Sequence, residues 1–370
     1  MNKHYLSPLF SPRSVAVIGA SDRVDSVGWV VFKNMLEGGY QGKLYPVNPN
    51  HAEIQGQRAY ADIKQIGEPI DLAVIVTKAA TVPDIIELCG VQGTRVALVL
   101  SAGFSEIGSQ GAALERAVVE NAKRYGMRLV GPNCLGILCP AVGLNATFSK
   151  GGAMAGNLAL ISQSGAFCTA ILDWARPNDV GFSSIISMGA AAGVDFGEIL
   201  DYLASDPHTD SILLYIEGIH RARGFMSALR AAARIKPIFV VKAGRHEAGS
   251  KAAFSHTGAL VGADDVFDAV LQRAGVVRVN TIVQLFSAAQ ALSTHFHPAG
   301  KRLAIVTNGG GPGVMASDRA VDLGVVIATL AEDTLAQLNA GLPETWSHSN
   351  PLDIIGDATA ERYRHAVTHC

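Results

Sequence analysis

The sequence predicts an α/β fold in which parallel sheets are built from repeated strand–helix units. Short apolar, β-branched runs recur along the 370 residues, and each is followed by a glycine-bearing or polar turn and then by a segment with helical spacing. Glycine is abundant, with 39 residues, as a chain with many strand-to-helix turns requires. Because strands that alternate with helices form parallel sheets with right-handed crossovers, we expect two to three α/β domains in series.

The first series of strands and helices occupies residues 1–145. Its predicted strands are Ser14–Ile18, Lys43–Val47, Leu72–Val76, Val96–Leu100 and Arg128–Val130. The helical segments between them include Val30–Leu36, Val82–Cys89 and Ala112–Arg124. This order of elements predicts a Rossmann-like domain.

A second series follows the small, polar stretch Asn145–Gly156, which is a candidate linker. Its predicted strands are Asn157–Ile161, Ser183–Ser187, Ile212–Ile216, Pro237–Lys242 and Val276–Val279. We expect a second α/β domain over residues 146–298. A third unit, 299–370, begins with the strand Lys301–Thr307 and is shorter than a typical domain of roughly 100–150 residues, so we expect it to be truncated.

The composition excludes several classes of protein. The chain is 49% hydrophobic and 17% charged, which excludes a disordered chain, and its net charge of −2 gives no reason to expect nucleic-acid or membrane binding. The five cysteines form no CxxC pair, so no metal site is predicted and a reducing compartment fits. The N-terminus has no signal-peptide core, and no apolar run is long enough to span a membrane, so we expect a cytoplasmic protein.

The first strand-to-helix turn, Gly19–Gly28, has the position of a phosphate-binding loop but not the GxGxxG spacing of a dinucleotide site. The second strand ends in Val47-Asn48-Pro49, without the acidic residue that holds the ribose of NAD. The turn can still aim backbone N–H groups at a phosphate. A nucleotide-bearing ligand other than NAD is therefore favoured, and the alternative is that Gly19 only permits a tight turn.

Two further turns are candidate anion sites. Ser162-Gln163-Ser164-Gly165 follows a predicted strand and precedes a helix, so its hydroxyl and N–H groups could hold a phosphate at the helix N-terminus. The alternative is an ordinary helix cap. The run Gly309-Gly310-Gly311 could form a second phosphate cradle, and the alternative there is a glycine-rich turn.

His256 lies in the glycine-punctuated loop 244–258 that follows the strand Pro237–Lys242. A neutral imidazole can attack phosphorus and carry the phosphoryl group. Glu217, at the end of another predicted strand, could bond the second ring nitrogen and fix its tautomer. For an isolated loop histidine a surface or capping role is the alternative, and it is our interpretation of the nearby His246.

Several motifs together resemble one family. They are Ser14–Ser21, Pro46-Val47-Asn48-Pro49, Ser101-Ala102-Gly103-Phe104, Gly131-Pro132-Asn133-Cys134-Leu135-Gly136, Ile161-Ser162-Gln163-Ser164-Gly165, Tyr215-Ile216-Glu217-Gly218, Ser255-His256-Thr257-Gly258, Asn308–Gly313 and Asn350-Pro351-Leu352-Asp353. In this order and spacing they resemble the ADP-forming acyl-CoA synthetases, which are related to succinyl-CoA synthetase. The resemblance covers essentially the whole chain and implies a Rossmann-like CoA-binding domain followed by flavodoxin-like domains.

The resemblance also implies where CoA or acyl-CoA binds. Its diphosphate, adenosine and pantetheine arm would in turn contact Gly19, Ala20, Ser21, Val47, Asn48, Pro49, Thr77, Ser101, Ala102, Gly103, Asn133 and Cys134. Lys78 stands at a loop position that is commonly small or proline in the family, and it could help to hold a phosphate. Cys134 also invites an interpretation as a thiol nucleophile, but burial beside the CoA thiol is a sufficient explanation of it.

By the same resemblance, His256 aligns with the family's phosphorylated histidine and Glu217 with the carboxylate that orients it. The implied reaction is acyl-CoA + ADP + phosphate ⇌ carboxylic acid + CoA + ATP, through an acyl phosphate and a phosphohistidine. Acetate is the expected acid. The sequence has no Walker A motif, and the family binds ATP or ADP with Mg²⁺ on a separate ATP-grasp region, which we expect downstream of residue 370 or on another subunit. Oligomerisation is expected from the resemblance alone.

Three alternatives remain at this point. Some members of the family are fused to an acetyltransferase domain, so the chain could be the acyl-CoA-sensing half of a protein lysine acetyltransferase; retention of His256 and Glu217 favours the synthetase. An NAD-dependent dehydrogenase would bind NADH and not CoA. A pure scaffold would leave three anion-binding turns without a use.

Overall fold

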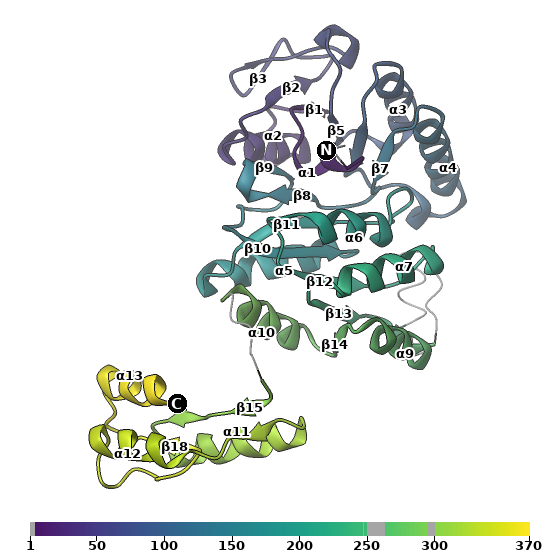
Figure 1. The fold of residues 1–370 in the computed structure, drawn as a ribbon. Coiled ribbons are helices and arrows are strands. Elements are labelled where there is room, and N and C mark those ends of the chain that lie inside the picture. The colour runs from purple at the N-terminus through teal and green to yellow at the C-terminus, as the bar shows by residue number, and fades with distance from the viewer. Residues whose placement is uncertain (1–3, 247, 250–262, 295–299) are drawn as a thin grey trace. The chain divides into compact units, whose positions relative to one another are not determined.

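The structure is a computed structural model that describes residues 4–246, 248–249, 263–294 and 300–370. The chain forms two compact units, Met1–His295 and Phe296–Cys370 (Figure 1). The described residues contain no helix that is long and apolar enough to cross a membrane.

The first sheet of the N-terminal unit has five parallel strands in the order β2-β1-β5-β6-β7. The strands are β1 (Ser14–Ile18), β2 (Lys43–Val47), β5 (Leu72–Ile75), β6 (Val96–Val99) and β7 (Arg128–Val130). Each lies within one residue of its predicted bounds. The chain passes from β1 to β2 on one side and returns to β5 on the other, so the strand order reverses beside β1.

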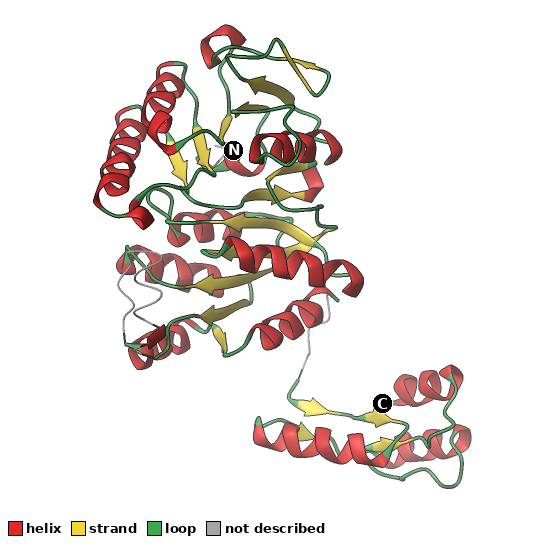
Figure 2. Cartoon of the chain, turned by 180° about the vertical axis from the view of Figure 1, so that it is seen from behind, coloured by secondary structure: helices red, strands yellow, loops and turns green. Residues whose placement is uncertain are grey.

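Helices cover both faces of this sheet (Figure 2). They are α1 (Ser7–Phe10), α2 (Val27–Glu37), α3 (Val82–Val91) and α4 (Ser109–Arg124), and a small hairpin of β3 (Glu53–Ile54) and β4 (Gln57–Arg58) follows β2. In β1, Val15 and Val17 belong to the core on the α2 side, while Ala16 and Ile18 belong to the core of α3 and α4. Because both faces are buried, the strand is continuously apolar rather than alternating.

The second sheet has seven strands in the order β14-β13-β12-β10-β11-β8-β9. Five are parallel, namely β10 (Ala155–Ser162), β11 (Phe182–Ser187), β12 (Ser211–Ile216), β13 (Ile238–Lys242) and β14 (Val277–Val279). The antiparallel hairpin of β8 (Gly136–Cys139) and β9 (Leu144–Thr147) extends the sheet at the β11 edge.

The hairpin differs from the sequence expectation. The sequence places residues up to 145 in the first domain and Asn145–Gly156 in a linker, yet Gly136–Cys139 pairs with β11 of the second sheet, and the residues around Asn145 form β9. Gly136 permits this close pairing, since a side chain there would overlap the carbonyl oxygen of Ala146. The domain boundaries themselves stay a prediction.

Helices also flank both faces of the second sheet. These are α5 (Gly165–Ala175), α6 (Phe196–Ser205), α7 (Ala222–Ala233), α9 (Asp264–Ala274) and α10 (Ile282–Ser293). One core joins α6, α7 and α9 to Ile212, Leu214 and Ile216 of β12, and the other joins α5 and α10 to Leu213 of the same strand. The sheet is thus a parallel core covered on both sides, as predicted for an α/β protein.

The C-terminal unit is small. It pairs β15 (Arg302–Leu303) with β17 (Val326–Ile327), and β16 (Val306–Thr307) with β18 (Leu352–Asp353), beside α11 (Gly310–Asp322), α12 (Glu332–Gly341) and α13 (Ala360–His369). The predicted strand Lys301–Thr307 is therefore split into two short strands. The core of the unit is a single cluster around Leu338, Trp346 and Leu352.

Candidate functional site

A cavity of about 440 Å³ lies at the carboxyl ends of β1, β2 and β5. Five residues that the sequence analysis assigns to coenzyme binding line it, namely Gly19, Val47, Asn48, Pro49 and Thr77. They follow three different strands, so the fold brings together residues that are far apart in the sequence. In parallel α/β sheets ligands bind at the carboxyl edge where the strand order reverses, and this cavity lies at that point.

The turn after β1 is held tightly against the start of α2. Gly19 has a φ of +97°, a conformation that favours glycine, and its N–H donates to the carbonyl of Val47 at 2.9 Å. A side chain at Gly28 would overlap the carbonyl oxygen of Gly19. Ser26 caps α2 by accepting from the N–H of Trp29. Gly28 therefore allows α2 to pack closely against the Gly19 turn, as a glycine of the GxGxxG motif does. Its spacing from Gly19, however, does not match that motif.

The neighbouring loops are tied to this turn by their own hydrogen bonds. Asn48 donates from Nδ2 to the carbonyl of Ala20 at 2.8 Å, which joins the end of β2 to the end of β1. The Ala20 side chain is fully buried in the core, and the Ser21 hydroxyl accepts from the N–H of Arg23. Ala20 and Ser21 do not line the cavity themselves.

Sequence reasoning missed most of the apolar wall of this cavity. The remaining lining residues are Ile18, Ala61, Asp62, Ile63, Lys78, Thr81, Ile85 and Leu88. Thr81, Ile85 and Leu88 are spaced by four and three residues, which places them on one helix face, and this spacing was a usable signal. The exposed Lys78 adds a positive charge at the rim.

Thr77, which is predicted for the pantetheine arm, lines this cavity, whereas the other residues predicted for that arm lie on the loops after β6 and β7, beyond its lining. Ser101 donates to the carbonyl of Thr77 at 2.6 Å, and the N–H of Asn133 donates to the carbonyl of Ser101 at 2.9 Å. The N–H of Gly103 donates to the carboxylate of Glu106, and Ala102 is exposed. Thr77, Ser101 and Asn133 therefore form one hydrogen-bonded edge next to the cavity.

Cys134 has the properties of a buried structural thiol. Its Sγ donates to the carbonyl of Val99, and the side chain is 3% exposed. Burial raises the pKa of the Cys134 thiol to about 12, so the thiolate that a nucleophile requires does not form at neutral pH. The geometry gives no support to a nucleophilic role.

The loop Ser162-Gln163-Ser164-Gly165 joins β10 to α5, as predicted. Ser164 caps α5 by accepting from the N–H of Phe167 at 3.2 Å. Ser162 donates to the carbonyl of Ser164 and accepts from its N–H, so its hydroxyl closes the turn. Of the first-turn N–H groups of α5, that of Phe167 is bonded to Ser164, and those of Gly165 and Ala166 are the groups that could face an anion.

Gln163 points to the neighbouring strand. Its Oε1 accepts from the N–H groups of Glu217 and Gly218 at 2.6 and 3.1 Å, and its Nε2 donates to the carbonyl of Gly218 at 3.0 Å. The side chain is buried, with 3% exposed. The amide predicted to bind phosphate thus braces the end of β12.

Glu217 lies at the end of β12 and lines a second cavity of about 370 Å³, together with Lys242 at the end of the adjacent β13. Glu217 is 7% exposed. Phe225 and Phe267 belong to the mainly apolar wall of this cavity. His256 lies outside the described residues, so its pairing with Glu217 stays a prediction.

Lys242 is a second feature that sequence reasoning missed, although a lysine that ends an apolar strand was visible. Its Nζ lies 3.6 Å from a carboxylate oxygen of Asp264 and donates to the carbonyls of Ala243 and Gly244. Burial lowers the pKa of Lys242, and Asp264 opposes this effect. Arg278 holds the same carboxylate at 2.6 and 2.8 Å, so the charges are paired across the ends of β13 and α9.

The glycine run of the C-terminal unit begins α11. The N–H of Gly309 donates to the hydroxyl of Thr307, and Gly310 is the first helical residue. A Cβ atom at Gly310 would lie 3.3 Å from a carboxylate oxygen of Asp353. Gly311 follows within the first turn of the helix. A negative charge already lies beside this helix N-terminus, which weakens it as a phosphate cradle.

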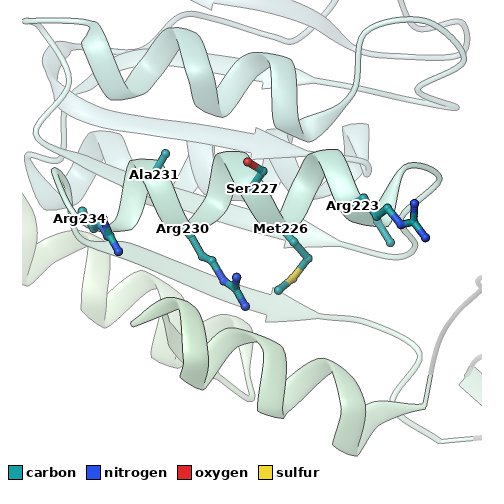
Figure 3. A pocket seen from close by; sticks show the side chains of 7 residues that line it. Arg223, Met226, Ser227, Arg230, Ala231 and Arg234 are labelled. Atoms are coloured by element: carbon teal, nitrogen blue, oxygen red, sulfur yellow. The ribbon is translucent and has the colours of Figure 1, made fainter.

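A further hollow, of about 560 Å³, lies along α7 and contains none of the predicted site residues (Figure 3). Its charged lining consists of Arg223, Arg230 and Arg234, which are exposed on one face of the helix, with Met226 between them. All of its lining residues belong to α7 or to the residue that follows it. It is a solvent-exposed helix face rather than an enclosed site.

Two family models match the chain. A CoA binding domain matches residues 13–140, and a succinyl-CoA ligase like flavodoxin domain matches residues 155–292. The two matches contain the first sheet with its cavity and most of the second sheet with the Ser162–Gly165 loop and Glu217. Fold and site therefore define an α/β protein with a CoA-binding domain and a flavodoxin domain like that of succinyl-CoA ligase.

Comparison with individual relatives narrows the class. The ADP-forming acetate–CoA ligase I of Archaeoglobus fulgidus is 45% identical over 97% of this chain. The alpha subunit of the ADP-forming acetate–CoA ligase I of Pyrococcus furiosus is 42% identical over 98% of this chain and 79% of its own length. The chain belongs to the family of ADP-forming acetate–CoA ligases, which confirms the resemblance drawn from the motifs.

A solved structure agrees with this family. The dinucleotide-forming acetyl-coenzyme A synthetase 1 of Candidatus Korarchaeum cryptofilum, in complex with phosphate and ADP, is 36% identical with a TM-score of 0.94 over 100% of this chain and 79% of that one. The predicted α/β fold class is thereby confirmed. The chain spans about half the length of the Archaeoglobus relative, with 52% covered.

Proposed function

We propose that this chain is the CoA- and acyl-handling part of an ADP-forming acyl-CoA synthetase whose acid is acetate. The reaction is acyl-CoA + ADP + phosphate ⇌ acid + CoA + ATP. The observation that carries the proposal is the cavity at the strand-order reversal of the first sheet, which collects five predicted coenzyme-binding residues in a chain of this family. The ligase names of the relatives favour this function over an acyl-CoA-sensing acetyltransferase half.

The residues of the first cavity fit CoA. Its apolar wall, including Ile63, Ile85 and Leu88, suits a flat adenine ring, while Asn48 fixes the loop beside it. The N-terminus of α2 lies against the Gly19 turn, where its first-turn N–H groups can face a diphosphate. The pantetheine arm would then follow the Ser101 and Asn133 loops, away from the adenine.

In the first proposed step, phosphate attacks the thioester carbonyl, the carbon–sulfur bond breaks, and the products are acyl phosphate and CoA. The first turn of α5, capped by Ser164, would hold the phosphate next to the acyl group. In the second step, a ring nitrogen of His256 attacks phosphorus, the phosphorus–oxygen bond to the acyl group breaks, and the carboxylate leaves. Glu217 would accept a hydrogen bond from the other ring nitrogen and stabilise the positive ring.

In the third step, the phosphoryl group passes from His256 to ADP, which restores the histidine and gives ATP. We assign ADP and Mg²⁺ to an ATP-grasp region on a further part of the protein or on a partner subunit. Two observations support that division: relatives are named as alpha subunits, and the related Korarchaeum synthetase, which is longer than this chain, was solved in complex with phosphate and ADP.

The test uses the full-length protein together with its nucleotide-binding region or subunit. ATP formation is measured from acetyl-CoA, ADP and phosphate, and CoA and NADH binding are measured by calorimetry. We expect CoA binding without NADH binding, and ATP formation that His256→Ala abolishes and His246→Ala leaves intact. Binding of acetyl-CoA without any ATP formation would contradict the proposal and favour the acyl-CoA-sensing alternative.

A further inference from the structure

We propose that Gln163 is a positioning residue, which holds Glu217 in register with the anion-binding turn of α5, and not a ligand of phosphate. The inference rests on the proposed function, in which Glu217 orients the phosphorylated histidine. It assigns to Gln163 a role that differs from the one its motif predicts.

The hydrogen bonds of Gln163 are directed at one short stretch of backbone. Oε1 accepts from the N–H of Glu217 at 2.6 Å and from the N–H of Gly218 at 3.1 Å. Nε2 donates to the carbonyl of Gly218 at 3.0 Å. The backbone N–H of Gln163 also donates to the carbonyl of Tyr215 at 3.3 Å. Four hydrogen bonds thus connect this single residue to the end of β12.

This use of the amide is hard to combine with phosphate binding. A glutamine amide offers two acceptor positions and two donors, and three of these four are occupied here. Only 3% of the residue is exposed. To donate both N–H groups to a phosphate, Gln163 would have to release the carbonyl of Gly218 and leave buried polar groups unpaired.

Gln163 lies where the paired strands β10 and β12 end, so its hydrogen bonds connect the two segments that follow them. The parallel strands β10 and β12 run side by side as far as Ser162 and Tyr215, after which the chain turns into α5 on one face and toward α7 on the other. Gln163 stands one residue past this last pair. Beyond this pair the two chain segments separate, and the Gln163 side chain spans the space between them. It thereby sets the distance between the first turn of α5 and Glu217.

Three of the four bonds act on Glu217 and its neighbour Gly218 directly. They fix the N–H of Glu217 and both the N–H and the carbonyl of Gly218, so the Cα of Glu217 cannot shift without breaking them. Gly218 has no side chain to lock the turn by packing. A misplacement of about 1 Å in a catalytic group can cost on the order of 100-fold in rate. We therefore expect the hydrogen bonds of the Gln163 side chain to affect turnover.

The test compares two substitutions with a matched control, in the full-length protein with its nucleotide-binding region. Gln163→Met keeps the length of the side chain and removes its hydrogen bonds, whereas Gln163→Glu keeps both acceptor positions. Thr209→Val is the control, because it removes the buried hydrogen bond to Ser183 and a half-buried one to Asp206, near the opposite, amino-terminal ends of the strands. The readouts are kcat, the KM for phosphate, and the rate of acid-labile phosphorylation of His256.

For Gln163→Met we expect kcat and the phosphorylation rate to fall about 10- to 100-fold, with the KM for phosphate changed less than about 3-fold. Gln163→Glu should recover part of the lost rate, since it can still accept from both N–H groups. Thr209→Val should keep the wild-type kcat. Should Gln163→Met fail to fold, the same comparison is made with Gln163→Glu, which is expected to show the smaller loss with the same unchanged KM.

Three results would overturn the inference. A KM for phosphate raised 10-fold or more with kcat retained would make Gln163 a phosphate ligand. Wild-type kinetics in both variants would leave it without a role. An equal loss of kcat in Thr209→Val would show that Gln163 contributes only to the general stability of the fold. These outcomes leave the proposed function intact, whereas absence of phosphorylation in the wild-type protein would refute that function and this inference together.

Discussion

Gly28→Ala tests whether the first cavity depends on the close approach of α2 to the Gly19 turn. An ideal Cβ atom at residue 28 would lie 2.0 Å from the carbonyl oxygen of Gly19, and Cβ atoms in real structures essentially never come closer than 3.0 Å. The helix or the turn must therefore move by about 1 Å. The carbonyl is backbone and cannot rotate away as a side chain would.

Two effects of this substitution oppose each other. Alanine in place of a helical glycine stabilises a helix by roughly 1 kcal/mol. Overpacking of a closely packed contact costs typically about 1–3 kcal/mol, and here the contact is to backbone. We expect a net loss of about 0–2 kcal/mol in the free energy of unfolding. CoA binding should be weaker by 10-fold or more, because Gly19 lines the cavity.

Gly224→Ala is the matched control. Gly224 also lies in a helix, and nothing lies within 4 Å of the position that its Cβ would occupy. The same change there should stabilise the protein by roughly 0.5–1 kcal/mol and leave CoA binding unchanged. Denaturant unfolding and calorimetry with CoA measure both quantities. The reasoning would be refuted if the two variants gave the same stability and the same affinity for CoA.

Three further predictions concern single charged or thiol groups. Burial raises the pKa of the Asp71 carboxyl, but its hydrogen bonds to Arg13 outweigh this effect and lower the pKa from its ordinary value. The ionised carboxylate therefore stabilises the fold above that ordinary value, and this contribution is lost as the pH falls through the lowered pKa. Asp71→Asn should therefore cost about 1 kcal/mol at pH 7, a value reduced for the exposure of Arg13, and nothing in strong acid, as measured by denaturant unfolding across pH. Cys134 should resist alkylation at pH 8 in the folded protein while the exposed Cys370 reacts, as peptide mass spectrometry can show. Lys78→Ala should weaken CoA binding about 3-fold at low salt, with a smaller difference in high salt, because an exposed ammonium contributes little energy and is screened.

Each of these predictions has a result that contradicts it. If Asp71→Asn lowered the free energy of unfolding equally at pH 2 and pH 7, the ionised carboxylate would not be the source of the stabilisation. Rapid alkylation of Cys134 would show a thiol that is accessible and ionised. Loss of all CoA binding in Lys78→Ala would mean that one surface charge dominates the affinity, contrary to the apolar lining of the cavity.

Much of the fold was readable from the sequence because buried parallel strands have a simple signature. Continuous apolar runs such as Ser14–Ile18 between glycine-bearing turns located all five strands of the first sheet. The hairpin of β8 and β9 was missed because its pairing with β11 is a long-range contact, and the turn Gly131-Pro132-Asn133 after β7 does not show which sheet the next strand joins. Gly136 marks it, but only the structure shows what approaches that glycine.

The sequence predicts which turns form the candidate site, but it does not predict what each residue in those turns does. Gly19, Asn48 and Thr77 were assigned to the coenzyme from their places after strands, and they line one cavity. The role of Gln163 could not be read, since a polar residue at a helix start is compatible with a ligand, a cap or a brace. Only the distances to the end of β12 separate these possibilities.

The central claim is that the chain carries a phosphoryl group on His256 between acyl phosphate and ADP. It is tested most directly by incubating the full-length protein and its nucleotide-binding region with acetyl phosphate and then adding ADP and Mg²⁺. Intact-protein mass spectrometry should show an acid-labile phosphate that is absent in His256→Ala, present in His246→Ala, and discharged by ADP as ATP. A wild-type protein that binds CoA but never acquires that phosphate would contradict the account.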